Sequence, residues 1–392
     1  MSDEYVDVES RSLFQNLGDS IKGVLVGIVL FFVSFPILWW NEGRVDPSSV
    51  AKNAVEVAAD GSKNDGEGKL VAINGELKAQ GTIGDPEFLA AGNYIKLFRN
   101  VEMYAWVETV KTENKKKVGG GTDVIKTYTY DLKWTSSPKS GAEFKYPEKH
   151  RNPPMTYESR SFAANTASVG AFNFDATKIQ MPSAKNLSLT DAMINAGVKG
   201  KVKRANDQYL FAGYGSLDNP GLGDTRISFS AVQPGGNVTL YGERHGKEVK
   251  AYDWKGEVTL FRVIEGTHKE ALKTMHGEHV MMTWILRLVG FFCMWIGLSS
   301  LLGPIHAILD IIPFVGSAGR FVVGLVLFPV ALVLSLITII VSNIFHSPIL
   351  MLLTIGAVVG LGMYMVKKKK AAGGAPPAAG GGGAAPPAQP AA

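Results

Sequence analysis

Long uncharged runs of hydrophobic residues interrupt the otherwise polar chain at four places. Three of the runs, residues 23–40, 321–345 and 347–366, carry no charged residue, and the fourth, residues 281–305, carries only Arg287. A bilayer core of about 30 Å needs roughly 20 apolar residues in a helix that rises about 1.5 Å per residue. The pattern therefore predicts four membrane-spanning helices, at residues 21–41, 280–303, 321–345 and 347–366.

Alternating hydrophobic and polar residues dominate residues 42–275, between the first two runs. In YTYDLKWT, Tyr128, Tyr130 and Leu132 alternate with polar residues, and this period of two predicts a half-buried strand. The aromatic and β-branched segment VEMYAWVETV precedes it, and the link KTENKKKVGGGTD predicts a hairpin with a lysine- and glycine-rich tip. Further strands are expected at residues 69–77, 94–99, 226–232, 237–241 and 257–264, and one short helix at SLTDAMINAG.

The remaining segments are short. Residues 1–20 are polar, with a short amphipathic helix expected near residues 13–21. Residues 304–320 are interrupted by proline and glycine and predict an interfacial or re-entrant segment. Residues 367–392 begin with lysines and continue as Ala, Pro and Gly, a composition that cannot build a core, so we expect a disordered tail. The expected fold class is a multi-pass α-helical membrane protein with a large β-rich (α+β) domain between spans one and two.

The distribution of positive charge predicts the orientation of the chain in the membrane. The net charge of +5 includes Lys367–Lys370, which follow the last span. The positive-inside rule places such a run in the cytoplasm next to anionic lipid. With four crossings, residues 1–20 would then be cytoplasmic and residues 42–275 extracytoplasmic. The lipid bilayer is the expected partner, and the charge does not indicate nucleic acid binding; the single cysteine, Cys293, excludes an intramolecular disulfide.

The first apolar run stops abruptly in FPILWWNEGRVD. Tryptophan prefers the headgroup zone, and asparagine and glycine are common at helix C-termini. One interpretation is an interfacial helix stop. The other adds an ion pair between Glu42 and Arg287, because a lone arginine near the outer end of a span is costly unless it snorkels or pairs. The residues concerned are Trp39, Trp40, Asn41, Glu42, Gly43, Arg44 and Arg287.

Motifs of catalytic chemistry are absent from the sequence, which has no Gly-x-Ser-x-Gly, Walker or zincin pattern. His276 and His279 have a spacing that metal sites use, but Gly277 weakens the helix between them. Histidine is also common at a wet interface, so we expect no metal site. We expect no enzyme activity and no cofactor.

The strand VEMYAWVETV carries acids and aromatic side chains on one face. Glu102 and Glu108 lie six positions apart, roughly 20 Å along a strand, which is too far for a glycosidase pair. We therefore expect Glu102 and Trp106 to belong to a structural or binding face.

Few polar residues lie inside the third and fourth spans, whereas a transporter usually places several there. Gly356 and Gly360 have the small-xxx-small spacing of close helix packing, either between copies or against the third span. This pattern favours a scaffold that associates with itself or with other membrane proteins. A channel or transporter component is the alternative.

Several motifs resemble the LUMA family, also called transmembrane protein 43: WWNEGR, RNVEMYAWVE, YTYDLKW, GLGDTRISF and TWILRLVGFFCMWIGLSSLLGPI. The resemblance covers residues 12–366 and implies a multi-pass protein concerned with membrane organisation. Animal members reside in the endoplasmic reticulum and inner nuclear membrane, where they are associated with lamin and emerin. The Ala/Pro/Gly tail favours a bacterial member, expected in the plasma (inner) membrane; a eukaryotic member is expected in the endoplasmic reticulum or inner nuclear membrane.

Overall fold

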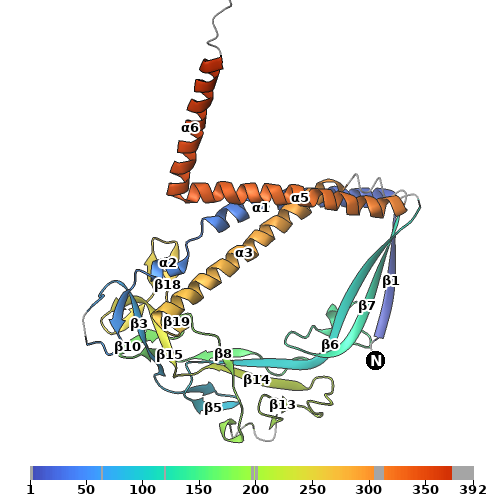
Figure 1. Cartoon of the computed structure of the whole chain (residues 1–392). Coiled ribbons are helices and arrows are strands. Elements are labelled where there is room, and N and C mark those ends of the chain that lie inside the picture. The colour runs from blue at the N-terminus through green and yellow to red at the C-terminus, as the bar shows by residue number, and fades with distance from the viewer. Residues whose placement is uncertain are drawn as a thin grey trace, which may run out of the picture.

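The computed structural model describes residues 3–62, 65–118, 121–195, 198, 202–303 and 313–372. Three of the four long helices lie together beside a β-rich region, and the last one, nearest the C-terminus, extends away from them (Figure 1). Each of the four is long and apolar enough to cross a membrane, as the apolar runs predicted. The helices of the described part are α1 (Leu13–Glu42), the short α2 (Pro47–Ala51), α3 (His268–Leu301), α5 (Pro313–His346) and α6 (Pro348–Ala372).

Three helix starts differ from the sequence-based boundaries. A capping box between Ser12 and Gln15 starts α1, so the short helix expected near residues 13–21 is continuous with the first span. A second capping box, between Thr267 and Glu270, starts α3 well before the expected residue 280. Residues 313–320 of the expected interfacial or re-entrant segment are helical and form the start of α5. Residues 304–312 of that segment, and the tail from residue 373, lie outside the described residues.

The larger sheet contains the predicted hairpin. Its strands β6 and β7 pair antiparallel from Met103 and Thr135 to Lys116 and Thr122. The strand order is β1-β7-β6-β14-β13-β12, with β8 also on β6 and β11 on β14. The bounds are β1 (Asp3–Arg11), β6 (Lys96–Lys116), β7 (Thr122–Thr135), β8 (Arg160–Ala163), β11 (Lys185–Asn186), β12 (Lys203–Arg204), β13 (Leu210–Ala212) and β14 (Thr225–Val232).

The second sheet has the order β19-β15-β16-β10-β9-β3-β2, with an added pairing between β15 and β3. Its strands are β2 (Val55–Ala58), β3 (Leu70–Ala79), β9 (Thr166–Val169), β10 (Phe172–Asp175), β15 (Asn237–His245), β16 (Glu248–Lys250) and β19 (Arg262–Glu265). Two small pairs are β4 (Ile83–Asp85) with β5 (Leu89–Gly92), and β17 (Tyr252–Trp254) with β18 (Val258–Leu260). Tyr241 and Leu260 pack with Ala271 and Met275, so the first turns of α3 belong to this core.

Two expected elements in the β-rich region are wrong. SLTDAMINAG forms a single 3₁₀ turn, Asp191–Met193, in its described part. Burial of Leu187 and Leu189 in the hydrophobic core holds the preceding backbone extended. The strand expected at residues 257–264 is divided into β18 and β19, which pair with different strands.

The N-terminal segment is a strand that the sequence-based prediction missed. β1 pairs antiparallel with β7 over its whole length, from Asp3 opposite Tyr130 to Arg11 opposite Thr122. Together β1, β7 and β6 form a long three-stranded ribbon that reaches from the β-rich region to the far end of α1 (Figure 1). There, Asn16 of α1 donates to the Thr122 hydroxyl at 2.9 Å. The ribbon and α1 therefore touch at the end of α1 that is distant from α2.

Candidate functional site: a polar junction between three helices

Helices α1, α3 and α5 pack around a small apolar core of Leu38, Phe291, Met294 and Ala331. Glycine allows α1 and α3 to come very close. A Cβ placed on Gly297 would lie 2.7 Å from the backbone nitrogen of Phe31 and 2.9 Å from the carbonyl oxygen of Gly27. Such contacts between backbones depend on small residues at helix crossings in membranes.

Glu42, at the end of α1, is the centre of a polar junction, which we define as Asn41, Glu42, Arg287, Ser342 and Asn343. Arg287 Nε donates to Glu42 Oε1 at 2.8 Å, and a terminal guanidinium nitrogen donates to Oε2 at 2.7 Å. Asn343 Nδ2 of α5 donates to Oε2 at 2.8 Å. The Glu42 side chain is only 3% exposed and that of Arg287 26%. The ion pair anticipated from the sequence is therefore present, with bidentate geometry.

The neighbouring residues of WWNEGR hold α1 to the other two helices. Asn41 is buried and donates to the Thr283 carbonyl of α3 at 3.1 Å. On α5, the Ser342 hydroxyl donates to the Trp39 carbonyl at 3.0 Å. A Cβ on Gly43 would lie 2.5 Å from the His346 ring. The pair of Glu42 in α1 with Arg287 in α3 could be anticipated from the sequence. The contacts made by Ser342 and Asn343 could not, because they depend on how α5 packs against α1.

The outer rim of the junction is aromatic. Trp39 contacts Phe345, with ring centroids 5.5 Å apart, and Trp40 remains 62% exposed. The Arg44 guanidinium lies 5.6 Å from the Trp40 ring centroid. An exposed tryptophan beside a cation at the end of an apolar helix fits a headgroup zone.

The junction joins helices rather than offering free reactive groups. The Glu42 and Arg287 charges offset each other. Within the described residues, the buried side-chain nitrogens and oxygens of the junction all have hydrogen-bond partners. An arrangement of this kind specifies one packing of three helices, and losing either partner leaves a charge without compensation.

The expected face on β6 is divided between two clusters. Glu102 accepts from Arg226 Nε at 2.7 Å, and the Arg226 guanidinium lies over Trp134 at 4.7 Å. Trp106 instead packs edge-on against His150, with centroids 4.8 Å apart. Glu102 and Trp106 therefore do not form one site.

The cluster around His150 ties β1 to the hairpin. His150 is buried, stacks on Tyr130 at 3.9 Å, and has Nε2 3.2 Å from a carboxylate oxygen of Asp3 in β1. The Tyr130 hydroxyl donates to Glu108. Burial, and then this hydrogen bond, raise the pKa of Tyr130 to about 12. The cluster thus fixes the N-terminal strand on the ribbon.

The histidines in the first turns of α3 do not meet at one site, and the buried Nδ1 of His279 has no hydrogen-bond partner within the described residues. His276 Nδ1 lies 2.6 Å from Asp46, and Glu278 accepts from Arg262 at 2.9 Å. His268 meets the Tyr241 hydroxyl at 2.8 Å. Across the described residues, no group of three or more metal-binding side chains is gathered.

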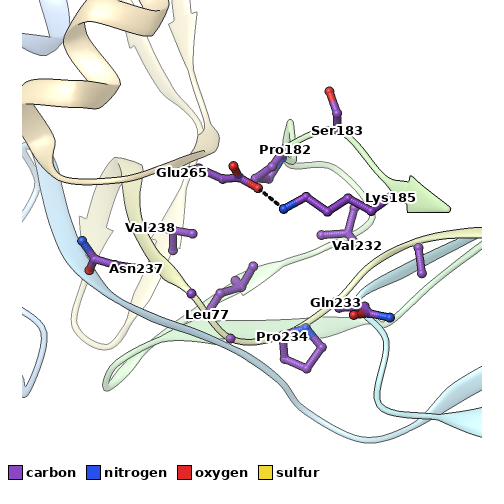
Figure 2. A pocket seen from close by; sticks show the side chains of 13 residues that line it. Leu77, Pro182, Ser183, Lys185, Val232, Gln233, Pro234, Asn237, Val238 and Glu265 are labelled. Carbon is purple, nitrogen blue, oxygen red and sulfur yellow. Dashed lines mark hydrogen bonds and ion pairs between the residues drawn. The ribbon is translucent and has the colours of Figure 1, made fainter. Parts of the chain in front are cut away.

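A hollow in the β-rich region lies beside the turn between β14 and β15 (Figure 2). Its volume is ≈ 360 Å³. Lys185 and Glu265 form an ion pair of 3.1 Å across it, and Leu77 and Pro234 contribute apolar wall. The two charged side chains that line this hollow are thus paired with each other.

Helix α6 extends away from the other helices (Figure 1). No described atom lies within 4 Å of a Cβ placed on Gly356 or Gly360. The glycine face expected for close packing therefore has no neighbour within the described chain.

Comparison with known proteins identifies the family. The family model described as Transmembrane protein 43 matches residues 103–348. Transmembrane protein 43 of Rattus norvegicus is 27% identical over 377 residues, covering 88% of this chain and 90% of the rat protein. The Homo sapiens protein is 27% identical over 379 residues, covering 90% and 92%. The Drosophila melanogaster homolog is 25% identical over 304 residues, covering 74% and 78%.

No solved structure matches the chain significantly. The family match spans part of the β-rich region together with α3 and α5. The four span-capable helices and the relatives together support a multi-pass membrane protein. The chain belongs to the transmembrane protein 43 family.

Proposed function

We propose that this protein is a non-catalytic membrane scaffold, which organises membrane structure or protein complexes. The observation that carries the proposal is the polar junction. Glu42, Arg287 and Asn343 come from three helices and bind one another. Groups used in this way hold a rigid platform, and they are not available to bind a substrate.

The exposed parts of the molecule offer surfaces for neighbours. Helix α6 carries an unoccupied glycine face at Gly356 and Gly360, which suits self-association or another membrane helix. The β-rich region stands beside the helices and can contact a second protein in the aqueous phase (Figure 1). The partners proposed are thus the bilayer, further copies of the chain and other membrane proteins.

The proposed location is the plasma membrane of a bacterial cell, with the β-rich region outside and the tail in the cytoplasm. Lys367–Lys370 at the end of α6 support this orientation through the positive-inside rule. For a eukaryotic member, the corresponding proposal is the endoplasmic reticulum or inner nuclear membrane.

A channel or transporter component is the competing function. Three polar groups of the helices bond to the protein itself: Ser34 donates to the Phe31 carbonyl at 2.6 Å, and Thr338 to the Leu334 carbonyl at 2.8 Å, both within one helix, while Ser342 donates across to α1. Transport sites instead keep polar groups open towards a pathway at mid-membrane. Because these groups are satisfied within the protein, the scaffold is favoured.

Two measurements on the full-length protein separate these functions. Quantitative crosslinking with mass spectrometry in native membranes should give reproducible links from α6 and the β-rich region to other chains. Purified protein in liposomes should not increase the flux of ions or small solutes above that of empty liposomes. The transporter would be favoured if the liposomes showed a flux that Glu42→Gln abolishes and if no intermolecular crosslinks formed.

A further inference from the structure

Helices α1 and α5 leave an apolar groove between them, close to the polar junction. Its volume is ≈ 450 Å³. The one hydroxyl in its wall belongs to Thr338 and donates to the Leu334 carbonyl of its own helix at 2.8 Å. The groove is lined by Phe35, Pro36 and Trp39 of α1 and by Ile337, Thr338 and Val341 of α5. An occupant of this groove should therefore be apolar.

Helix α6 is apolar and has few neighbours in its own chain. None of the residues Pro348–Met365 is buried. Leu352, Leu353 and Ile355 point in different directions from the helix and are between 52% and 67% exposed. A helix that is hydrophobic all round is normally covered by protein or by lipid. Helix α6 is thus available to cover an apolar groove.

The joint between α5 and α6 keeps α6 away from the groove of its own chain. The Ser347 N–H donates to the Asn343 carbonyl at 3.1 Å, and the Ser347 carbonyl accepts from the Met351 N–H at 2.9 Å. Ser347 therefore completes the last turn of α5 and also begins the first turn of α6. Antiparallel helices that pack about 8–10 Å apart are usually joined by a loop of about two to five residues. A return of α6 onto its own α5 would require one of the two helix ends to unwind.

The groove and α6 match in depth. In the proposed orientation, α6 returns through the membrane antiparallel to α5 and brings its lysine run to the cytoplasm. Leu353 lies six residues after Ser347 and Val341 six residues before it, so both are about 9 Å from the joint. Gly356 and Thr338 match in the same way, each nine residues from Ser347. A two-fold axis along the membrane normal preserves these depths in a second copy of the chain.

We propose that α6 of one copy lies in the groove between α1 and α5 of a second copy, and that the second copy places its α6 in the first. This inference rests on the proposed scaffold function, because it names the surface that receives a further copy of the chain. Leu353 would fill the groove beside Val341. Gly356, three residues further along and on the same face of α6, would let its backbone approach Thr338. The exchange is reciprocal, so the assembly closes as a dimer.

The contact area is sufficient for a specific dimer. The 18 residues of Pro348–Met365 extend over about 27 Å, and a helix is about 10 Å wide. Each docked helix would cover about 270 Å² on either surface, so the reciprocal exchange would remove roughly 1,100 Å² from lipid. A specific interface needs about 1,000 Å². One docked helix alone would supply only about half of this area, which favours the reciprocal arrangement.

Disulfide trapping in native membranes tests this arrangement. In a Cys293→Ser background, one full-length chain carries Val341→Cys and a second, differently tagged chain carries Leu353→Cys. Mild oxidation should join the two chains, as measured by mass spectrometry of the linked peptides. The matched control carries Tyr364→Cys in place of Leu353→Cys, on the same face of α6 but eleven residues, about 17 Å, further along. The control pair should remain reduced.

A single chain that carries both Val341→Cys and Leu353→Cys separates the possible occupants of the groove. The proposal expects links between chains. A link within one chain would overturn it and assign the groove to α6 of the same copy. No link, or a link equal to the control, in protein that keeps the wild-type unfolding temperature would also overturn it and leave the groove to lipid. These outcomes do not alter crosslinks from the β-rich region to other proteins, so the proposal can fail while the scaffold function stands.

Discussion

Arg287 of α3 holds both carboxylate oxygens of Glu42, at 2.8 Å and 2.7 Å, at the place where α1 ends. The same carboxylate accepts from Asn343 of α5 at 2.8 Å. A single acidic side chain thus determines the relative position of three long helices. The geometry makes the junction the point at which substitutions should have the largest effect on the bundle.

Removing one member of the pair should destabilise the protein. Glu42→Gln and Arg287→Leu each leave the opposite charge without compensation in a partly dehydrated site. We expect each to lower the free energy of unfolding by about 2 kcal/mol, less than a fully buried pair because Arg287 remains partly exposed. The double variant should lose less than the sum, because both changes break one contact.

Thermal unfolding in detergent measures this double-mutant cycle. Exchange of the charges, Glu42→Arg with Arg287→Glu, should restore part of the stability, since the pair can form again. Strictly additive losses with no recovery on exchange would show that Arg287 serves another group.

A methyl group at the crossing of α1 and α3 should force the helices apart. Gly297→Ala would place a Cβ 2.7 Å from the Phe31 nitrogen, and backbone cannot move aside as a flexible side chain can. We expect a loss of about 1–3 kcal/mol, the usual cost of overpacking. The control is Gly324→Ala in α5, where no described atom lies within 4 Å of the added carbon. Similar unfolding temperatures for the two variants would contradict the close approach.

The glycine face of α6 should mediate self-association. Leucine at Gly356 and Gly360 would fill the space that lets two backbones approach, so the mass of the detergent-solubilised particle should fall. Light scattering after size-exclusion chromatography measures that mass. Val358→Leu, on the opposite face of α6, enlarges an exposed side chain and should leave the mass unchanged. An unchanged mass for the double glycine variant, with the protein folded, would exclude this face as the contact.

The ribbon should lose stability at alkaline pH. The pKa of Tyr130 is raised from 10.0 to about 12 by burial and by its bond to Glu108, so the folded state favours the neutral phenol. This contribution is complete below pH 10 and is lost as the pH rises through about 12. At neutral pH, Tyr130→Phe should be less stable than the wild type, because the hydrogen bond to Glu108 is lost. Its free energy of unfolding should, however, change less than that of the wild type between pH 10 and about 12.

Phenolate absorbance and unfolding curves across this pH range provide the measurement. Burial also raises the pKa of Tyr241, and lysines titrate nearby, so the difference between wild type and Tyr130→Phe is the quantity to compare. Parallel pH profiles for the two proteins would show that Tyr130 ionises like an exposed tyrosine.

The long helices could be predicted because length and lack of charge suffice to define them. The hairpin could be predicted because Tyr128 and Tyr130 alternate with polar residues over a long segment. The pair of Glu42 with Arg287 was available as one of two interpretations, since both residues lie near the end of an apolar run.

Strand β1 could not be found in this way. Its hydrophobic residues Val6 and Val8 are exposed, and its attachment comes from backbone pairing and from Asp3 beside His150. Those partners lie more than a hundred positions away in the sequence. Likewise, the role of Asn343 depends on the packing of α5 against α1, which no local pattern contains.

The joint between α5 and α6 has a mechanical consequence. Ser347 alone separates the two helices, and Pro348 lacks the N–H that would continue the first helix into the second. His346, the last residue of α5, lies against Gly43 and contacts Ser342 within the junction. A lateral pull on α6, from a neighbouring protein or from a change in bilayer thickness, is therefore applied one residue away from the group that fastens α1. We therefore expect a force on α6 to reach α1 through the contact between Gly43 and His346.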